Sequence, residues 1–461
     1  MSAASVEQYL RAHRSRHLEE LRAFLRIPSI SALSAHRADM VRAAEWLAEH
    51  MRGCGLHGIE VIRTEGHPIV YGERIDVPDG PTALIYGHYD VQPIDPPEAW
   101  TSPPFDPVIR EGRIYARGAS DDKGQLFLHL KAIEAFVATG GRLPVNVKVL
   151  IEGEEEVGSA HLAPFVSAER ARLAADVVVI SDSTLYQADL PALCVGLRGI
   201  IDFEIHLRTG QSDLHSGLFG GTVPNALHVM ADLVAGLHDA DGRVNVPGFY
   251  AAVRPLSPLE QQSVARLPFD PAAFCQAAGV KGLVGEAGFS PLERIWARPT
   301  LEVNGLWGGF QGEGPKTIVP AEAHAKFTCR LVADQDPEAI AASIEAELRR
   351  RCPEYAALVI RRGAAAPPWQ CSPDEPALQA AARALQAAYG VEPALIRMGG
   401  SIPVVPTLAR LLEAPVVLMG FGLPSDNVHA PDEHFHLADF DRGLRAIIHY
   451  WERLAESGAG D

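Results

Sequence analysis

Residues 145–159 read VNVKVLIEGEEEVGS, an apolar strand-like run that ends in four glutamates within five positions: Glu152, Glu154, Glu155 and Glu156. Four like charges at this spacing repel one another. They are tolerated where something positive binds, and the carboxyl end of a buried strand is where ligands bind in an open α/β sheet. One glutamate can then bind a cation while its neighbour acts as a base, and the remaining two are expected to face solvent.

The composition sets the class of protein. The chain has 461 residues, with 41 Lys and Arg against 58 Asp and Glu. This length exceeds the roughly 250–300 residues at which one hydrophobic core stops growing, so at least two domains are expected. The net charge of −17 and the lack of a basic stripe disfavour nucleic acid as a partner. No apolar run is long enough to cross a membrane, the first residues lack a signal-peptide pattern, and the six cysteines form no disulfide framework, so a cytoplasmic protein is expected.

The spacing of apolar residues predicts alternating helices and strands at both ends of the chain. Helices are expected over 5–26, 37–52, 123–139, 375–389 and 437–455, and strands over 58–64, 82–86, 145–151, 176–180 and 415–420. The strand-like runs 200–207 and 325–331 and the helices 222–238 and 337–351 predict a smaller α+β domain. The expected fold is α/β, a mixed, mostly parallel sheet sandwiched by helices in segments 1–199 and 367–461, with the smaller domain inserted at 200–366.

Polar clusters follow four apolar runs, at LIYGHYDV (84–91), GASDDKG (118–124), the glutamate stretch and VVVISD (177–182). The carboxyl ends of parallel strands meet at one edge of a sheet, so these acids and His88 are expected to converge. Mixed imidazole and carboxylate ligands suit divalent cations, which hydrolytic enzymes often bind in pairs. Taken singly, His88 can be an interior histidine, Asp121-Asp122 a helix cap and Asp182 a cap of the next segment.

Seven motifs occur in order along most of the chain: GHYDVQP (87–93), GRIYARGASDDKG (112–124), EGEEEVGS (152–159), VISDS (179–183), SDLHSGLFGG (212–221), MGGSIPV (398–404) and HAPDE (429–433). Together they resemble the dinuclear metallopeptidase family of carnosine-type dipeptidases, aminoacylase, succinyl-diaminopimelate desuccinylase and carboxypeptidase G. The likeness is greatest to the cytosolic nonspecific dipeptidase branch. It implies two divalent cations per subunit, with zinc as the first choice and manganese or cobalt as alternatives.

The resemblance also implies a set of metal ligands, which are His88, Asp121, Glu156, Asp182 and His429. Asp121 is similar to the carboxylate that bridges both ions, which in this family often precedes a cis peptide bond. Glu155 resembles the general base, and Asp90 resembles the acid that steadies the imidazole of His88. His434 and His436 compete with His429, but only His429 has the family's H-x-x-x-E spacing, to Glu433.

Further roles fall in and near the inserted segment, which the resemblance identifies as a lid and dimerisation domain. His215 resembles a histidine that reaches into the partner subunit's site and steadies the developing oxyanion, which implies a homodimer. Thr317 and Arg330 resemble contacts to the terminal carboxylate of the substrate, for which a guanidinium is suited. Gly400 and Ser401 resemble a backbone-and-hydroxyl binding loop.

The expected function is hydrolysis of the peptide bond of dipeptides or very short peptides by a water that bridges two metal ions, with Glu155 as the base. Asp182 stands where the deacylases and carboxypeptidases of the family tend to have glutamate, which favours the dipeptidase branch. An N-acyl or N-carbamoyl amino acid amidohydrolase on the same scaffold is the first alternative. A metal-binding dimer without catalysis is the second.

Overall fold

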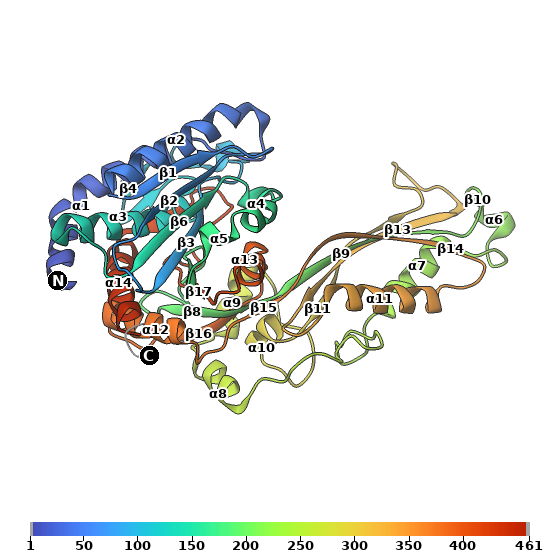
Figure 1. The fold of residues 1–461 in the computed structure, drawn as a ribbon. Helices are drawn as coiled ribbons and strands as arrows, with labels where there is room; N and C mark the ends of the chain where they lie inside the picture. The colour runs from blue at the N-terminus through green and yellow to red at the C-terminus, as the bar shows by residue number, and fades with distance from the viewer. Residues whose placement is uncertain (1–2, 458–461) are drawn as a thin grey trace. The chain divides into compact units, whose positions relative to one another are not determined.

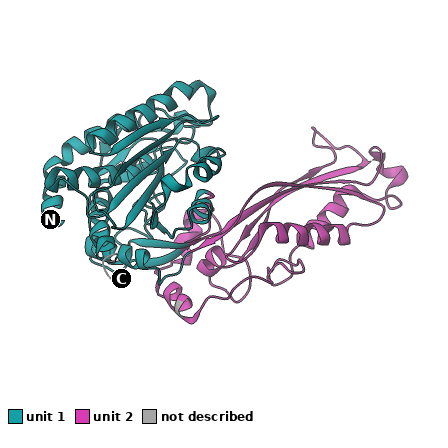
Figure 2. Ribbon diagram, in the orientation of Figure 1, with its two compact units in different colours: residues 1–195, 371–396, 404–461 teal, residues 196–370, 397–403 magenta. Residues whose placement is uncertain are grey.

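The computed structural model describes residues 3–457 and divides the chain into two compact units. Unit 1 contains the chain up to Val195, residues Cys371–Ile396 and the chain from Val404 onward (Figure 2). Unit 2 contains residues Gly196–Gln370 and Arg397–Pro403. The chain therefore leaves unit 1 twice, once for a long insertion and once for a short loop.

Unit 1 is built on a sheet whose strands run in the order β1-β2-β6-β3-β7-β17-β8. The bounds are β1 His57–Ile62, β2 Ile69–Arg74, β3 Thr82–His88, β6 Asn146–Glu152, β7 Val177–Ile180, β8 Ala192–Leu197 and β17 Val416–Leu418, with β16 (Ala394–Met398) also paired to β8. Strands β6, β3, β7 and β17 are parallel, β1 and β2 are antiparallel to their neighbours, and β8 is antiparallel to β17. The predicted mixed, mostly parallel sheet is confirmed.

Helices cover both faces of this sheet (Figure 1). One layer consists of α1 Ala3–Leu25, α2 Arg37–Gly53, α3 Lys123–Gly140, α12 Pro376–Tyr389 and α14 Leu437–Ser457, and the other of α4 Leu162–Ala168, α5 Arg170–Leu173 and α13 Val404–Leu412. Alternate strand residues such as Ile85, Val149 and Val179 join the core under the first layer. Since both faces are covered, β7 is buried at all four residues. No helix within 3–457 is long and apolar enough to span a membrane.

Short elements complete unit 1 around the carboxyl ends of the strands. They are the three-stranded sheet β18-β5-β4, with β4 Val108–Arg110, β5 Arg113–Tyr115 and β18 His434–His436, and the 3₁₀ turns Ser34–His36, Pro97–Ala99 and Glu155–Val157. The last of these turns is the glutamate stretch itself, which follows β6 directly.

Unit 2 contains an antiparallel sheet in the order β11-β13-β9-β14, with bounds β9 Gly199–Arg208, β11 Thr300–Gly308, β13 Glu322–Leu331 and β14 Ala357–Ala366. Buried and half-buried residues alternate along β9, and the buried side packs on α7 (Ala226–Ala235) and α11 (Pro337–Arg351). Phe203 and Phe327 stack in this core with ring centroids 4.8 Å apart. The smaller elements are α6 Ser216–Phe219, α8 Pro258–Arg266, α9 Pro271–Ala278, α10 Pro291–Trp296, β10 Leu214–His215, β12 Ile318–Val319 and β15 Trp369–Gln370.

The predicted helices and strands correspond to elements with similar bounds, with one clear difference. The helix expected over 222–238 is the shorter α7. It begins after Asn225, whose side chain accepts hydrogen bonds from the backbone N–H groups of Leu227 and His228, and it ends at Gly236. The capping residue Asn225 therefore sets the start of the helix, although the apolar pattern begins earlier.

We expect the substitution Gly141→Ala to destabilise the end of α3. Gly141 has φ 73° and a new Cβ would meet nothing within 4 Å, so the cost, about 1 kcal/mol, comes from the left-handed backbone alone. The melting temperature should fall by roughly 2–4 °C. Gly53→Ala is the matched control, because Gly53 lies in α2 and its Cβ would also meet nothing within 4 Å. Equal melting temperatures for the two variants would contradict this account.

Candidate metal centre

The five predicted metal ligands come together in unit 1, where the strands of the sheet end. His88 is the last residue of β3, Glu156 lies in the turn after β6, and Asp182 follows β7. Asp121 lies just before α3, and His429 lies in the loop between β17 and β18. Parallel strands bring these separate segments to one edge, as expected for an open α/β sheet.

The ligand atoms form two groups that share one carboxylate, Asp121. In the first group, Nε2 of His88 lies 3.1 Å from Oδ1 of Asp121 and 3.9 Å from Oδ2 of Asp182. In the second, Nε2 of His429 lies 2.9 Å from Oδ2 of Asp121 and 3.2 Å from Oε2 of Glu156. Each oxygen of Asp121 thus faces a different histidine. The bond between Asp121 and Asp122 is cis, as the resemblance implied.

The ring of His88 presents Nε2 to this site. Its Nδ1 lies 3.1 Å from the carbonyl oxygen of Asp90, to which only an N–H can donate, so in the neutral ring that binds a metal ion Nε2 carries the lone pair. Nε2 is buried and has no hydrogen bond from any residue in the described chain. A buried nitrogen lone pair beside two carboxylates is an arrangement that a cation stabilises. The donor set therefore fits a metal ion.

Asp90 connects the first histidine to the glutamate turn. Its carboxylate accepts the backbone N–H of Glu155 at 3.3 Å and that of Glu156 at 3.1 Å, and its Oδ1 lies 3.4 Å from Nδ1 of His88. Gln92 donates to Oε2 of Glu156 at 2.7 Å. One buried carboxylate thus orients the ring of His88 and holds the turn that carries the candidate base.

The buried carboxylates of the site favour the binding of positive charge. Burial and the carboxylates of Asp182 and Glu156 raise the pKa of Glu155 to about 9, although His88 opposes them, and burial and Asp121 raise the pKa of Asp182 to about 7. Hydrogen bonds to Asp121 and Glu156 raise the pKa of His429 to about 10. Burial lowers the pKa of His88, but Asp121 and Asp90 outweigh it and raise that pKa well above its ordinary value. Divalent cations here would return Glu155 and Asp182 to their charged forms.

The four glutamates of the opening stretch point to different partners. Glu152 accepts hydrogen bonds from the hydroxyls of Tyr86 at 2.5 Å and Ser159 at 2.8 Å, and it is buried. Glu154 is also buried and accepts the backbone N–H of His67 at 3.1 Å. The expectation that these two face solvent is therefore wrong, because both fold inward to satisfy buried donors. Only Glu155 and Glu156 are directed to the candidate metal centre.

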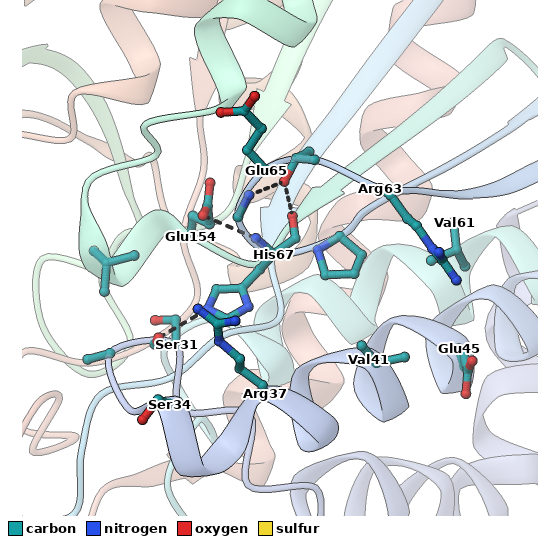
Figure 3. Close-up of a pocket in the computed structure, with 15 residues that line it drawn as sticks. Ser31, Ser34, Arg37, Val41, Glu45, Val61, Arg63, Glu65, His67 and Glu154 are labelled. Carbon is teal, nitrogen blue, oxygen red and sulfur yellow. Dashed lines mark hydrogen bonds between the residues drawn. The ribbon is translucent and has the colours of Figure 1, made fainter.

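Glu154 lines a cavity of about 810 Å³ behind the turn (Figure 3). Arg37, Arg63 and His67 also line it, and Nε2 of His67 lies 3.0 Å from the carbonyl oxygen of Ser31. None of the five candidate metal ligands contributes to its wall. The cavity is therefore separate from the ligand cluster.

The sequence pattern identified Glu433 only by its spacing from His429 and did not predict its hydrogen bonds. Glu433 is fully buried, and Nη1 of Arg117 donates to its Oε2 at 2.8 Å. The backbone N–H groups of Gly118, Ser120 and Asp121 also donate to it, at 2.9, 2.9 and 3.1 Å. Glu433 thus fixes the backbone that presents the shared carboxylate. The fixed spacing between His429 and Glu433 was the available signal.

The remaining candidate residues belong to unit 2. The guanidinium of Arg330 donates to Oγ of Ser401 at 2.8 Å, and the hydroxyl of Ser401 donates to the carbonyl oxygen of Arg198 at 2.5 Å. Gly400 directly precedes Ser401 in the chain. His215 lies in β10, which pairs with β12, and the backbone N–H of Ser216 donates to the carbonyl of Thr317. Contact of any of these residues with substrate stays a prediction.

Comparison with known proteins places these features in a family. Residues 84–453 match peptidase family M20/M25/M40. The chain is 31% identical to Cys-Gly metallodipeptidase dug1 of Schizosaccharomyces pombe over 93% of each chain, and 28% identical to the human Beta-Ala-His dipeptidase over 98% of this chain and 92% of that one. The solved structure of the M20 family metallo-carboxypeptidase Sso-CP2 from Sulfolobus solfataricus has a TM-score of 0.83 and 32% identity, covering 95% of this chain and 99% of that one.

We expect Asp90→Asn to weaken metal binding about 10- to 100-fold, because the amide cannot hold His88 and both turn N–H groups as the carboxylate does. Metal affinity is measured by titrating the metal-free protein with Zn²⁺. The control is Asp176→Asn, since Asp176 also accepts a backbone N–H, that of Thr82 at 2.7 Å, but at the opposite end of β3. If the two variants bind Zn²⁺ equally, Asp90 does not support the site.

Proposed function

Because the chain belongs to peptidase family M20/M25/M40, we propose that it is a metal-dependent dipeptidase that hydrolyses the peptide bond of dipeptides or very short peptides. The observation that supports this most directly is the shared carboxylate. Asp121 faces His88 with one oxygen and His429 with the other, and Glu155 lies beside them in the same turn as Glu156. This arrangement provides ligands for two ions and a separate acid for proton transfer.

The names of the relatives support a dipeptide as substrate. Cys-Gly metallodipeptidase and Beta-Ala-His dipeptidase are both named for the cleavage of dipeptides, and both align with most of this chain. The two named substrates differ in side chain and in backbone length, and each is a short chain with a free amino group and a free carboxyl end. The alternative substrates, N-acyl and N-carbamoyl amino acids, have the same carboxyl end but no free amino group.

Each residue of the centre has a separate task in the proposed reaction. His88 and Asp182 would hold one ion, Glu156 and His429 the other, and Asp121 both. When bound, two such cations polarise the scissile carbonyl and lower the pKa of a bound water. Glu155 takes the proton of that water with its carboxylate and passes it to the leaving nitrogen. We assign zinc to the site, with manganese and cobalt as alternatives.

Residues of unit 2 are proposed to bind the carboxyl end of the substrate. The guanidinium of Arg330 and the hydroxyl of Thr317 would bind the terminal carboxylate, and Gly400 and Ser401 would border it. Arg330 already bonds to Ser401, which holds the guanidinium in one direction. We infer further that the protein is a cytoplasmic homodimer in which His215 donates to the oxyanion in the partner's site.

We expect Glu155→Gln to lower kcat at least about 100-fold and to leave metal binding intact, because an amide cannot accept the proton of the water. The assay measures hydrolysis of Ala-Ala together with metal content. Glu154→Gln is the matched control, since Glu154 lies in the same turn but its carboxylate contacts His67 and His161. A Glu155→Gln variant with near-normal turnover would refute the assignment of the base. Metal-loaded wild-type protein that cleaves no short peptide would instead support the non-catalytic alternative.

We expect Arg330→Ala to lower kcat/KM for dipeptides roughly 10- to 100-fold, because a charged hydrogen bond to the terminal carboxylate is lost. Amidated dipeptides, which lack that carboxylate, should be poor substrates for wild type and insensitive to the substitution. Lys326→Ala is the control, because Lys326 lies on the same face of β13.

The substrates tested also include N-acetyl and N-carbamoyl amino acids. Faster hydrolysis of these than of dipeptides would overturn the dipeptidase proposal.

A further inference from the structure

A second cluster of metal-binding side chains lies in unit 1, apart from the five ligands described above. It consists of Asp426, His434 and His436. His434 and His436 are two residues apart in β18, so their side chains point to the same face of the strand. Oδ1 of Asp426 lies 3.8 Å from Nε2 of His434 and 3.7 Å from Nε2 of His436. None of these atoms belongs to the groups around Asp121.

Two atoms at the centre of this cluster are buried without a partner. The side chains of Asp426 and His434 are 0% and 5% exposed, and neither Oδ1 of Asp426 nor Nε2 of His434 has a hydrogen bond to any described residue. The other oxygen of Asp426 is fully used, since it accepts the N–H of Leu423 at 2.8 Å and the hydroxyl of Ser120 at 3.0 Å. A buried carboxylate oxygen left in this way costs stability unless something positive binds it.

The tautomer of His434 places a second unpaired acceptor beside Oδ1 of Asp426. Its Nδ1 lies 2.9 Å from the carbonyl oxygen of Asp432 and therefore donates an N–H to it. In the neutral ring Nε2 then carries a lone pair, so a nitrogen lone pair faces a carboxylate oxygen across 3.8 Å with no hydrogen between them. Two acceptors that face each other repel, and a cation between them removes the repulsion.

The nearest fixed positive charge does not fill this role. Arg113 lies opposite His436 in the pairing of β5 with β18. Its Nη1 lies 3.5 Å from the hydroxyl of Tyr115, and within the described chain it forms no ion pair with Asp426. The guanidinium of Arg113 therefore leaves Oδ1 of Asp426 without a hydrogen bond from the described residues.

We propose that Asp426, His434 and His436 bind a third divalent transition-metal ion, of the Zn²⁺ type. Two imidazoles and one carboxylate are a common ligand set for such ions. Ligands about 2.0–2.1 Å from an ion in tetrahedral geometry lie about 3.3–3.5 Å apart. The distances from Oδ1 of Asp426 to the two imidazole nitrogens, 3.8 and 3.7 Å, need to contract by only a few tenths of an ångström, and all three ligand atoms lie within 4.8 Å of one another. His436 is 23% exposed, which leaves a path by which an ion and a water ligand enter. This site does not depend on the proposed dipeptidase activity.

Such an ion would close the base of the loop that carries His429. Asp426 lies at the start of this loop and His434 at its end, and the N–H of His434 already donates to the carbonyl of Asp426 at 3.0 Å. The loop between them also contains Glu433, which holds the backbone of Asp121. The third ion is therefore a structural ion, which joins the two ends of a segment that contributes to the catalytic centre.

The test counts bound ions and needs no activity. Metal-free full-length protein is titrated with Co²⁺, and bound metal per chain is measured after desalting. We expect His436→Gln and His434→Gln each to bind one equivalent fewer than wild type. His449→Gln should bind as many ions as wild type, because His449 has a similar exposure, 22%, and lies beside the carboxylates of Glu7 and Glu452 on another face of unit 1.

A second comparison isolates the site from the shared-carboxylate centre. Asp121→Asn should still bind one Co²⁺ with the visible absorption of a nitrogen-ligated ion, and Co²⁺ should raise its melting temperature. Adding His436→Gln to Asp121→Asn should abolish both effects. Circular dichroism checks that each variant is folded. If folded His434→Gln and His436→Gln bind as many ions as wild type, the proposal is overturned, and Asp426 and His434 instead share a proton.

Discussion

The candidate metal centre depends on how the carboxylate of Asp121 is held. Its two oxygens face two histidines from distant parts of the chain, His88 and His429. The backbone that carries this carboxylate is held in place, because the N–H groups of Gly118, Ser120 and Asp121 donate to the buried Glu433. Glu433 in turn is neutralised by Arg117, so a buried ion pair fixes the position from which both metal groups are built.

Much of the fold was predictable because its strongest signals are local. Buried strands such as Val177–Ile180 have apolar runs bounded by polar residues, and α3 begins and ends at recognisable residues. Several strands were not predicted, among them β2, β8, β11 and β14. β8 is buried at every residue and β14 is largely exposed, so neither alternates clearly between polar and apolar residues.

The site was predictable to a different extent. The candidate ligands His88, Glu156 and Asp182 stand at or after the ends of predicted strands, and the order of all five resembles a known family, so the sequence could predict that they converge. The partners of Glu152, Glu154 and Glu433 could not be read in the same way, because Tyr86, His67 and Arg117 approach them only in the folded chain. Hydrogen-bond partners that are far apart in the chain leave no periodic pattern in the sequence. A buried acid therefore cannot be distinguished from a solvent-exposed one by sequence pattern alone.

The position of β17 in the sheet has a consequence for biosynthesis. β17 pairs with both β7 and β8, although it is made more than two hundred residues after them. While the nascent chain is still on the ribosome, β7 and β8 cannot pair with β17 until residues 416–418 have been made. His429 is made later still. The first half of unit 1 therefore depends on residues made late for its completion, and an unfinished chain lacks His429, the ligand that we propose for the second metal group.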